Sequence, residues 1–520
     1  MLEEDGLELS FREGGDAGFY ACFGNEEISE PVNSKVHALA AAMIGVPGVT
    51  DLIPGYWNLF VEFNPNLTSR TVLEVAVRER VSSALPAPTS PREVVIPVRY
   101  DGTDLTDVMR LTGLTRDKVV ALHTGRAYTV YALGFTPGFP YLGTLDKRLH
   151  VPRLETPRST TPANSVAIAN GQTGIYPMES PGGWRVIGTA LTRVFDPARL
   201  EPFLLSAGDT VRFTESQTSS ESEIPETRGQ IADETGIPTF RILEPGLLSS
   251  LQDEGRRFVG RYGLARAGAL DIAAHHRANA LVGNLKSAAS LEMTLRGPKL
   301  EVLSDTVIAV AGGGVSIQLN GSSLPLHTSF AVKHGDTLTF PHASHGARAY
   351  LSVRGGFAAQ TVYSSSSTDL RAGLGGVQLE AGVTLRRLEA SAVRAGFSLE
   401  PFRPYGDAVL RVTPGPQADL FPREAWAALT SGAYRVIAGD RMGLRLEGAA
   451  LPASRHEIVS EGVPVGSLQV SPNGQPMLLL NDRGTLGGYA KIAVVETTDL
   501  PRAAQLRTGD GVRFRLVGAL

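Results

Sequence analysis

The feature that most constrains the fold is a repeat in which three short segments recur in the same order about three hundred residues later. Several matched motifs at similar spacing indicate two copies of one folding unit. A site between two such units is a common place for ligand binding. The matched pairs are 162–166 (PANSV) with 464–468 (PVGSL), 181–184 (PGGW) with 486–489 (LGGY), and 207–213 (AGDTVRF) with 508–514 (TGDGVRF).

The length of 520 residues predicts three or four domains, because one hydrophobic core does not grow to this size. Frequent Gly and Pro between short alternating apolar segments indicate mainly β structure with α+β elements. We predict a small α/β domain over 1–90, a β-rich unit over 91–214, a flexible acidic linker over 215–238, and two further β-rich lobes over 239–400 and 401–520.

Charge and composition narrow the class of partner and the compartment. A net charge of −4 argues against nucleic acid and against an anionic membrane surface. No apolar run reaches the length of a membrane span, and the N-terminal sequence does not resemble a signal peptide. The one cysteine, Cys22, excludes an internal disulfide and suits a reducing compartment. We therefore expect a cytoplasmic protein.

Residues 134–143 (GFTPGFPYLG) predict a rigid loop, since proline fixes φ and glycine permits close backbone approach. The rings of Phe139 and Tyr141 are then either core residues or the wall of a ligand site.

A Gly-Gly pair precedes an aromatic residue in both copies of the repeat. Gly182 and Gly183 stand before Trp184, and Gly487 and Gly488 stand before Tyr489. Such a segment is either a hairpin turn with an aromatic anchor or a backbone nest that binds an oxygen atom.

Charged residues provide the remaining candidates. Arg153 and Arg158 both follow a proline in a predicted loop, where they are either solvated or bind carboxylate or phosphate. The segment 252–256 (QDEGR) puts acid and base beside a glycine, so that Asp253 and Arg256 belong either to a surface ion pair or to a functional site, and Asp271 is a helix N-cap or a catalyst.

No histidine pattern predicts a metal site. His275 and His276 are adjacent on a predicted helix and face different ways, and His342 and His345 have no carboxylate or cysteine close by. The phosphate-binding loop of nucleotide hydrolases, the G-x-S-x-G elbow and a biotin attachment site are all absent from the sequence. We therefore expect no metal ligated by histidine and no biotin on this chain.

Many ordered motifs resemble one known pair of proteins. The first half resembles allophanate hydrolase subunit 1, the family of the B subunit of bacterial 5-oxoprolinase, and residues 239–520 resemble allophanate hydrolase subunit 2, the family of the C subunit. The resemblance covers nearly the whole chain except the linker. It rests on 134–143, 151–153 (VPR), 156–158 (TPR), 165–168 (SVAI), 173–177 (TGIYP), 181–184, 250–256 (SLQDEGR), 268–271 (GALD), 278–284 (ANALVGN), 291–292 (LE) and 348–351 (RAYL).

This resemblance implies a natural fusion of the two subunits. It implies cyclophilin-like β-barrels, one over 91–214 and two over 239–400 and 401–520, behind the small N-terminal α/β domain. It also implies an ATP-dependent lactam hydrolase that opens 5-oxo-L-proline to L-glutamate, with ATP and Mg²⁺ and with a separate partner that resembles the A subunit of 5-oxoprolinase. We expect a small lactam or amide as substrate, and we expect that homo-oligomers can form.

Phosphate or carboxylate would then bind Arg153, Arg158 and Arg256, with backbone donors from the two Gly-Gly pairs and walls from Phe139, Tyr141 and Tyr489. Asp253, Asp271 and His123 are the catalytic candidates. We predict that the site lies where the two bodies meet, with Arg158 and Asp271 close together.

Two departures from the family pattern bear on specificity. Ser366 stands where the family has arginine, and Leu486 stands where it has threonine. Similar domains form the carboxyltransferase part of urea carboxylase, so carboxyl transfer with a separate biotin carrier is an alternative. Similar domains also form the Kip-type pair that regulates a histidine kinase, which is a non-enzymatic alternative.

Overall fold

The computed structural model describes residues 8–24, 26, 28–83, 92–217, 235–343, 345–376, 379–389, 394–400 and 408–518. Of the predicted linker over 215–238, residues 218–234 lie outside this part of the chain. Its two ends belong to strands, since Glu215 closes β13 and Ile237 opens β14.

The N-terminal unit is a four-stranded antiparallel sheet in the order β1-β2-β4-β3. Every residue of β2 is buried, so both faces of the sheet are covered. The helices α1 and α2 place Val36, Leu39 and Leu73 in the core beside it. The elements are β1 (Leu9–Glu13), β2 (Gly18–Phe23), α1 (Glu30–Met43), β3 (Val49–Pro54), β4 (Asn58–Phe63) and α2 (Arg70–Ser82).

The second unit is a closed barrel in the order β10-β7-β6-β13-β5-β12-β9. Two short helices, α3 and α4, pack on it, and a two-stranded ribbon of β8 and β11 extends from it. The elements are β5 (Glu93–Arg99), α3 (Leu105–Thr112), α4 (Arg116–Thr124), β6 (Ala127–Leu133), β7 (Pro140–Gly143), η1 (Lys147–Leu149), β8 (Arg158–Thr161), β9 (Ser165–Ala169), β10 (Gln172–Ile175), β11 (Ser180–Gly182), β12 (Arg185–Ala190) and β13 (Thr210–Glu215).

The third unit differs from the expected barrel. It has a seven-stranded sheet, β20-β19-β22-β17-β14-β25-β24, and a five-stranded sheet, β15-β16-β23-β18-β21, with a shared apolar core. Helix α5 packs on β18 and β23. The elements are β14 (Ile237–Glu244), β15 (Leu248–Gln252), η2 (Gly260–Tyr262), α5 (Ile272–Leu281), β16 (Ser290–Thr294), β17 (Lys299–Val302), β18 (Thr306–Gly312), β19 (Ile317–Leu319), β20 (Ser322–Leu324), β21 (Ser329–Val332), β22 (Thr337–Thr339), β23 (Arg348–Val353), β24 (Phe357–Ala358) and β25 (Thr384–Arg387).

The fourth unit is again a closed barrel, β26-β33-β30-β31-β28-β27-β34, with a ribbon of β29 and β32. Its strand order becomes that of the first barrel when β31 is set against β10, β30 against β9 and β34 against β13. The elements are β26 (Ala408–Pro414), η3 (Ala418–Leu420), α6 (Arg423–Ser431), β27 (Tyr434–Gly439), β28 (Gly443–Glu447), β29 (Glu457–Gly462), β30 (Ser467–Val470), β31 (Pro476–Leu479), β32 (Leu486–Tyr489), β33 (Lys491–Val495), η4 (Thr497–Asp499), α7 (Leu500–Ala503) and β34 (Gly511–Leu516).

The predicted duplication and the mainly β fold are therefore confirmed. Each of the three repeated segments supplies the equivalent strand in both units: β9 and β30 in the barrels, β11 and β32 in the ribbons, and β13 and β34 in the barrels. Both barrels pair their first and last strands in parallel, which closes each barrel in the same way.

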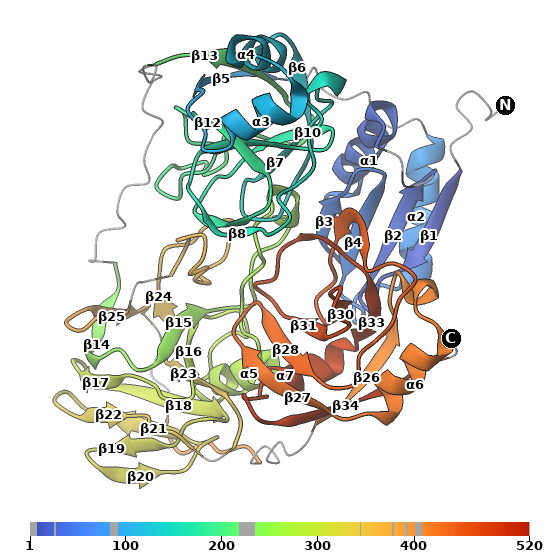
Figure 1. Ribbon diagram of the computed structural model, residues 1–520. Coiled ribbons are helices and arrows are strands. Elements are labelled where there is room, and N and C mark those ends of the chain that lie inside the picture. The colour runs from blue at the N-terminus through green and yellow to red at the C-terminus, as the bar shows by residue number, and fades with distance from the viewer. Residues whose placement is uncertain are drawn as a thin grey trace.

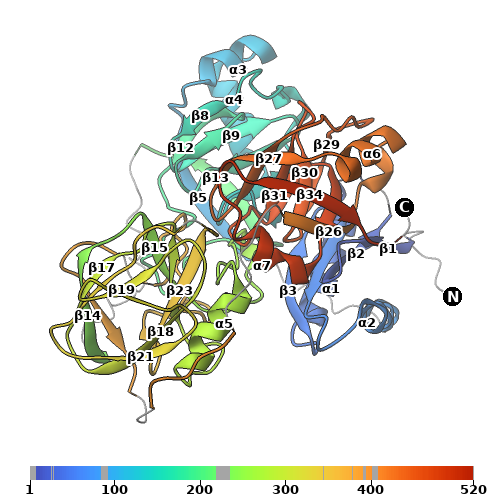
Figure 2. The same cartoon turned by 90° about the horizontal axis from the view of Figure 1, so that it is seen from below.

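Segments far apart in the sequence lie side by side. Figures 1 and 2 both place the N-terminal sheet against the C-terminal barrel, with α5 between that barrel and the third unit. The Tyr20 hydroxyl donates to the Gly462 carbonyl oxygen over 2.6 Å, and Arg12 forms an ion pair with Glu461 at 2.5 Å. This arrangement creates the cavity described below.

Candidate functional site

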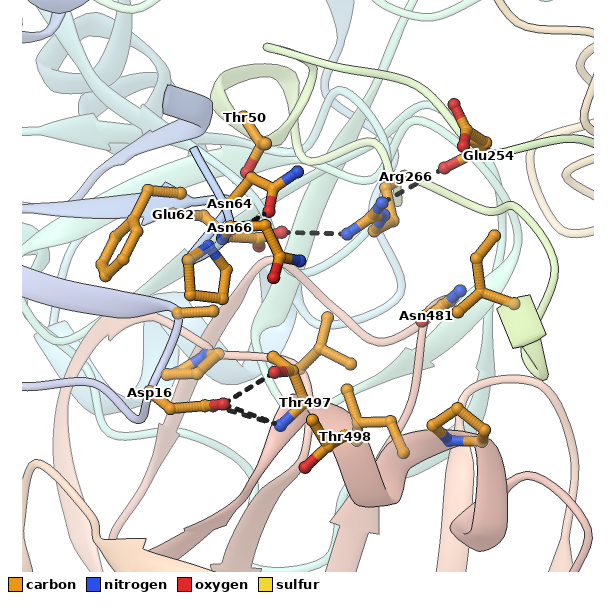
Figure 3. Close-up of a pocket in the computed structure, with 18 of the residues that line it drawn as sticks. Asp16, Thr50, Glu62, Asn64, Asn66, Glu254, Arg266, Asn481, Thr497 and Thr498 are labelled. Carbon is orange, nitrogen blue, oxygen red and sulfur yellow. Dashed lines mark hydrogen bonds and ion pairs between the residues drawn. The ribbon is translucent and has the colours of Figure 1, made fainter. Parts of the chain in front are cut away.

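A cavity of about 510 Å³ opens where the N-terminal sheet, the start of α5 and the C-terminal barrel meet (Figure 3). This volume is within the range of about 300–1,000 Å³ that is usual for small-molecule sites. Apolar side chains such as Phe60, Leu270 and Val494 line much of it, and polar groups are interspersed among them. The lining residues are Gly14, Asp16, Ala17, Thr50, Phe60, Glu62, Phe63, Asn64, Pro65, Asn66, Glu254, Arg257, Arg266, Ala269, Leu270, Ile272, Ala273, His276, Pro464, Val465, Asn481, Val494, Thr497, Thr498, Leu500 and Pro501.

A tight loop brings the segment before α5 to the cavity. Gly255 and Gly268 have φ of +87° and +82°, and a Cβ on Gly268 would lie 2.9 Å from the Gly255 Cα. Only glycine fits such a left-handed, close approach without strain. The crossing of these two glycines thereby places Glu254, Arg257 and Arg266 in the lining.

An ion-pair network joins the two halves of the chain at one wall. The Arg266 guanidinium lies 3.1 Å from the Glu62 carboxylate and also donates to the Glu254 carbonyl oxygen over 3.1 Å (Figure 3). Arg483 approaches the same Glu62 at 3.5 Å. Glu62 thus has two arginine partners, and its charge is compensated within the protein.

A histidine and a carboxylate pair at the edge of the cavity. His276 Nε2 lies 2.9 Å from Glu254 Oε1, and the side chains are 27% and 36% exposed. If Nε2 carries the proton of this hydrogen bond, Nδ1 is the proton acceptor. The pair can therefore accept a proton from a bound molecule.

Two further lining residues have a polar group without a partner in the described part of the chain, and one of these groups is exposed while the other is buried. Arg257 is exposed and has no hydrogen bond or ion pair there. The Thr50 hydroxyl is buried and also has no partner among those residues. By contrast, Asp16 accepts hydrogen bonds from the Thr497 amide and hydroxyl (Figure 3). Among the described residues, Arg257 is thus the one lining cation without a partner.

Directly behind the lining, Asp51 on β3 accepts a hydrogen bond from the Gly260 amide at 3.1 Å. Burial, aided by the charge of Glu62, raises the pKa of Asp51 to about 7. This carboxyl group links the N-terminal sheet to the third unit.

The aromatic loop forms a core rather than the wall of this cavity. Phe139 contacts Tyr141, Tyr176 and Trp184 with ring centroids 5.0, 5.1 and 5.6 Å apart. Leu486 of the other barrel belongs to the same buried cluster. The aromatic residues of the first barrel therefore anchor the second one.

Arg153 lies at the exposed rim of this cluster. Burial raises the pKa of Tyr141 to about 12, and the nearby Arg153 charge offsets part of that rise. Arg153 has no hydrogen bond or ion pair within the described ranges, so its predicted anion-binding role stays a prediction.

Arg158 lies in strand β8 and forms an ion pair with Asp104, whose side chain is 6% exposed. The predicted loop position is thus wrong. Gly182 in β11 pairs with Arg158, and a Cβ there would lie 2.3 Å from the Tyr176 hydroxyl oxygen. The neighbouring Gly183 accepts a hydrogen bond at its carbonyl oxygen from the Leu154 amide.

In the second barrel, Gly487, Gly488 and Tyr489 form strand β32, which pairs with β29. Gly182 and the second Gly-Gly pair therefore belong to equivalent two-stranded ribbons, so the hairpin-turn interpretation is wrong for them.

The candidates from the third unit have structural partners. Asp253 accepts hydrogen bonds from the hydroxyls of Ser365 and Ser367, each at 2.6 Å, and from the Ser366 amide at 2.7 Å. Arg256 is 2% exposed and donates to the Ser367 carbonyl oxygen. These contacts hold the 363–369 loop in place, so Ser366 lies beside Asp253 and outside the cavity lining.

Asp271 is the N-cap of α5. One carboxylate oxygen accepts from the Ala274 amide at 2.9 Å and the other from Gln505 Nε2 at 2.7 Å. The side chain is fully buried, and burial raises its pKa to about 6. The structure does not bring it to Arg158, whose partner Asp104 belongs to the first barrel.

His123 is a core residue of the first barrel. It is fully buried, lies 2.6 Å from the Tyr100 hydroxyl and 2.9 Å from the Thr173 hydroxyl, and stacks on Phe213. Burial lowers its pKa to about 3, so it remains neutral. These contacts do not place it at any ligand site.

Sequence reasoning missed most of the cavity. Glu254 lies inside the 250–256 motif, and His276 stands out in the sequence only as one of two adjacent histidines. Their opposite orientation is confirmed, because His275 is buried against Ser290 while His276 lines the cavity. Glu62, Arg257 and Arg266 have no local signal in the sequence.

Two absences concern the described residues. No group of three or more His, Cys, Asp or Glu side chains there is placed to hold a metal ion. Among the same residues, no helix is both long and apolar enough to cross a membrane.

Comparison with known proteins assigns both halves to one class. Residues 9–205 match the model of the carboxyltransferase domain, subdomains C and D, and residues 262–516 match that of subdomains A and B. The architecture is therefore that of a two-part carboxyltransferase-domain protein.

The chain belongs to the family of the B and C subunits of 5-oxoprolinase, with a region similar to each of them in one polypeptide. It is 43% identical to the 5-oxoprolinase B subunit of Escherichia coli O157:H7, over 36% of this chain and 89% of that protein. It is 33% identical to the 5-oxoprolinase C subunit of Escherichia coli K12, over 53% of this chain and 90% of that protein.

Solved structures agree with this assignment. The crystal structure of the protein TTHA0988 superimposes with a TM-score of 0.89 at 42% identity, over 97% of this chain and 100% of that one. The urea amidolyase of K. lactis superimposes with a TM-score of 0.51 at 26% identity, over 64% of this chain and 23% of that one.

Proposed function

We propose that this chain is a component of an ATP-dependent 5-oxoprolinase that hydrolyses 5-oxo-L-proline to L-glutamate together with a separate protein similar to the A subunit of that enzyme. The observation that carries the proposal is the cavity, because both regions build it. Residues 14–66 come from the region similar to the B subunit, and Asn481, Val494 and Thr497 come from the region similar to the C subunit. The regions that resemble two components of one enzyme thus line one cavity, whose size suits a small molecule.

The cavity suits a small polar ring better than a large ligand. Its apolar walls can enclose the ring carbons, and its hydrogen-bonding groups can fix the polar edge of the ring. Opening a lactam requires a better electrophile than the amide itself, and activation of the amide oxygen makes one. The residues of this chain would bind and orient the lactam for that step.

The lining does not fit the triphosphate of ATP. Glu62 and Asp16 are already engaged, and Arg257 is the one lining cation without a partner among the described residues. A triphosphate needs several cations or backbone amide donors. The ATP-dependent step of the reaction is therefore not assigned to this cavity.

The test measures glutamate formed from 5-oxoproline by the purified chain and a 5-oxoprolinase A subunit, with and without ATP and Mg²⁺. We expect glutamate only in the complete mixture. Folded proteins that form no glutamate in that mixture, over a range of pH and ionic strength, would contradict the proposal.

A second candidate is carboxyl transfer to an amide. Both family models are named for carboxyltransferase domains, and the structure superimposes on part of a urea amidolyase. The test adds a carboxylated biotin carrier and an amide in place of ATP and 5-oxoproline. Transfer of labelled carboxyl from the carrier would favour this alternative.

A further inference from the structure

We infer that the cavity binds a small cyclic amide that bears a carboxylate, with Arg257 as the carboxylate-binding group and His276, held by Glu254, as the acceptor for the amide N–H. This inference rests on the proposed function and adds the two residues that recognise the ligand.

Arg257 is assigned because it is the one lining cation without a partner among the described residues. Among the charged lining residues, Arg266 has Glu62, Glu254 has His276, and Asp16 has Thr497. Arg257 alone is exposed to the cavity without a hydrogen bond or ion pair to the described residues. A guanidinium can bind one carboxylate through two parallel hydrogen bonds. The lining therefore offers one unpaired guanidinium for a carboxylate of the ligand.

His276 is assigned by its geometry on α5. The residue before it, His275, is turned into the protein, where it bonds to Ser290 and to the Lys286 carbonyl oxygen. His276 instead lies at the cavity with Nε2 on Glu254. The carboxylate favours the tautomer in which Nε2 carries the proton, so Nδ1 accepts a hydrogen bond. A secondary ring amide offers one N–H donor for it.

The remaining lining fits the rest of such a ligand. The Asn64 and Asn66 side chains provide polar groups for a ring carbonyl, and they come from the turn that follows β4 (Figure 3). Apolar contact comes from Phe60, Leu270 and Val494.

The experiment is calorimetric titration of the full chain with 5-oxoproline, with 2-pyrrolidinone, which lacks the carboxylate, and with N-methyl-5-oxoproline, which lacks the N–H. Arg257→Ala should weaken 5-oxoproline binding at least tenfold and leave 2-pyrrolidinone binding unchanged. His276→Phe should weaken 5-oxoproline binding severalfold and leave the N-methyl analogue unchanged. Arg513→Ala, which removes an exposed arginine on β34 outside the lining, is the matched control.

The possible results separate the two assigned contacts from the proposed function. The Arg257 contact is overturned if Arg257→Ala weakens the binding of 5-oxoproline and of 2-pyrrolidinone equally. The His276 contact is overturned if His276→Phe weakens the binding of 5-oxoproline and of its N-methyl analogue equally. Wild-type affinity for 5-oxoproline in both variants overturns both contacts. If 5-oxoproline binds as described but no glutamate forms with the A subunit, the proposed function fails and the binding site stands. If glutamate forms and neither variant changes binding or KM, the site assignment fails and the proposed function stands.

Discussion

Asp51→Asn should make the protein less sensitive to pH, because Asp51 is a buried carboxyl group at the contact between the N-terminal sheet and the third unit. Its side chain is 7% exposed, and its carboxylate oxygens accept from the Gly260 and Leu52 amides. Burial, followed by the charge of Glu62, raises its pKa to about 7. In the unfolded chain the same group titrates near the ordinary aspartate pKa of 3.8.

The sign of the effect follows from proton binding. Between about pH 4 and pH 7 the folded protein holds a proton on Asp51 that the unfolded chain releases. The free energy of unfolding therefore falls as pH rises through this window, by about 1.4 kcal/mol per pH unit. Between pH 5 and pH 8 the contribution of Asp51 should fall by roughly 3 kcal/mol, and asparagine cannot ionise and should show no such fall.

The assay is urea unfolding of the wild type and of Asp51→Asn at four values between pH 5 and pH 8, followed by tryptophan fluorescence. The contributions of all other titrating groups cancel in the difference in unfolding free energy between the two proteins, provided that the substitution leaves those groups unchanged. Asp117→Asn is the matched control, since the Asp117 side chain is 94% exposed. A difference that stays constant over this range would refute the reasoning, as would a variant that loses stability relative to wild type as pH rises.

Three other substitutions test the placement of residues predicted to be functional. Arg158→Ala should lower the free energy of unfolding by about 1.5–3 kcal/mol, since it leaves the buried Asp104 without its ion-pair partner; an unchanged melting temperature would contradict this. His123→Ala should lower the melting temperature by several degrees and leave 5-oxoproline affinity unchanged, as scanning calorimetry and titration would show, because the residue is a core group; lost binding in a folded variant would restore its functional role. Leu486→Ala should cost about 2–5 kcal/mol of unfolding free energy, because its side chain packs on Gly134 across the two barrels; a cost below about 1 kcal/mol would show that this contact is not tight.

The duplicated fold could be predicted because repetition is a local property of the sequence. The segments 162–166 and 464–468 each lead into a barrel strand. Their similarity is visible in the sequence without knowledge of tertiary contacts. The cavity could not be predicted in the same way. Glu62 and Arg266 are 204 residues apart and lie in segments without a shared motif. Their meeting depends on how the N-terminal sheet docks on the remaining units.

The roles of the predicted catalytic residues also depend on contacts with distant parts of the chain. The sequence makes Asp253 a candidate because it lies in the 250–256 motif, where acid and base stand beside a glycine. The structure places that carboxylate among the hydroxyls of Ser365 and Ser367, more than one hundred residues away, where it fixes a loop. The N-cap interpretation of Asp271 is correct, since the residues of α5 that follow it give a local signal.

The proposed site is tested most directly by a substitution whose side chain fills the cavity. Ala273 lies on α5 in the lining, and Ala280 is an exposed alanine on the same helix. With a 5-oxoprolinase A subunit, ATP and 5-oxoproline, the initial rate of glutamate formation should fall at least tenfold in Ala273→Phe and stay at the wild-type level in Ala280→Phe, while both variants keep the wild-type circular dichroism spectrum. A wild-type rate in Ala273→Phe would contradict the claim that this shared cavity is the functional site.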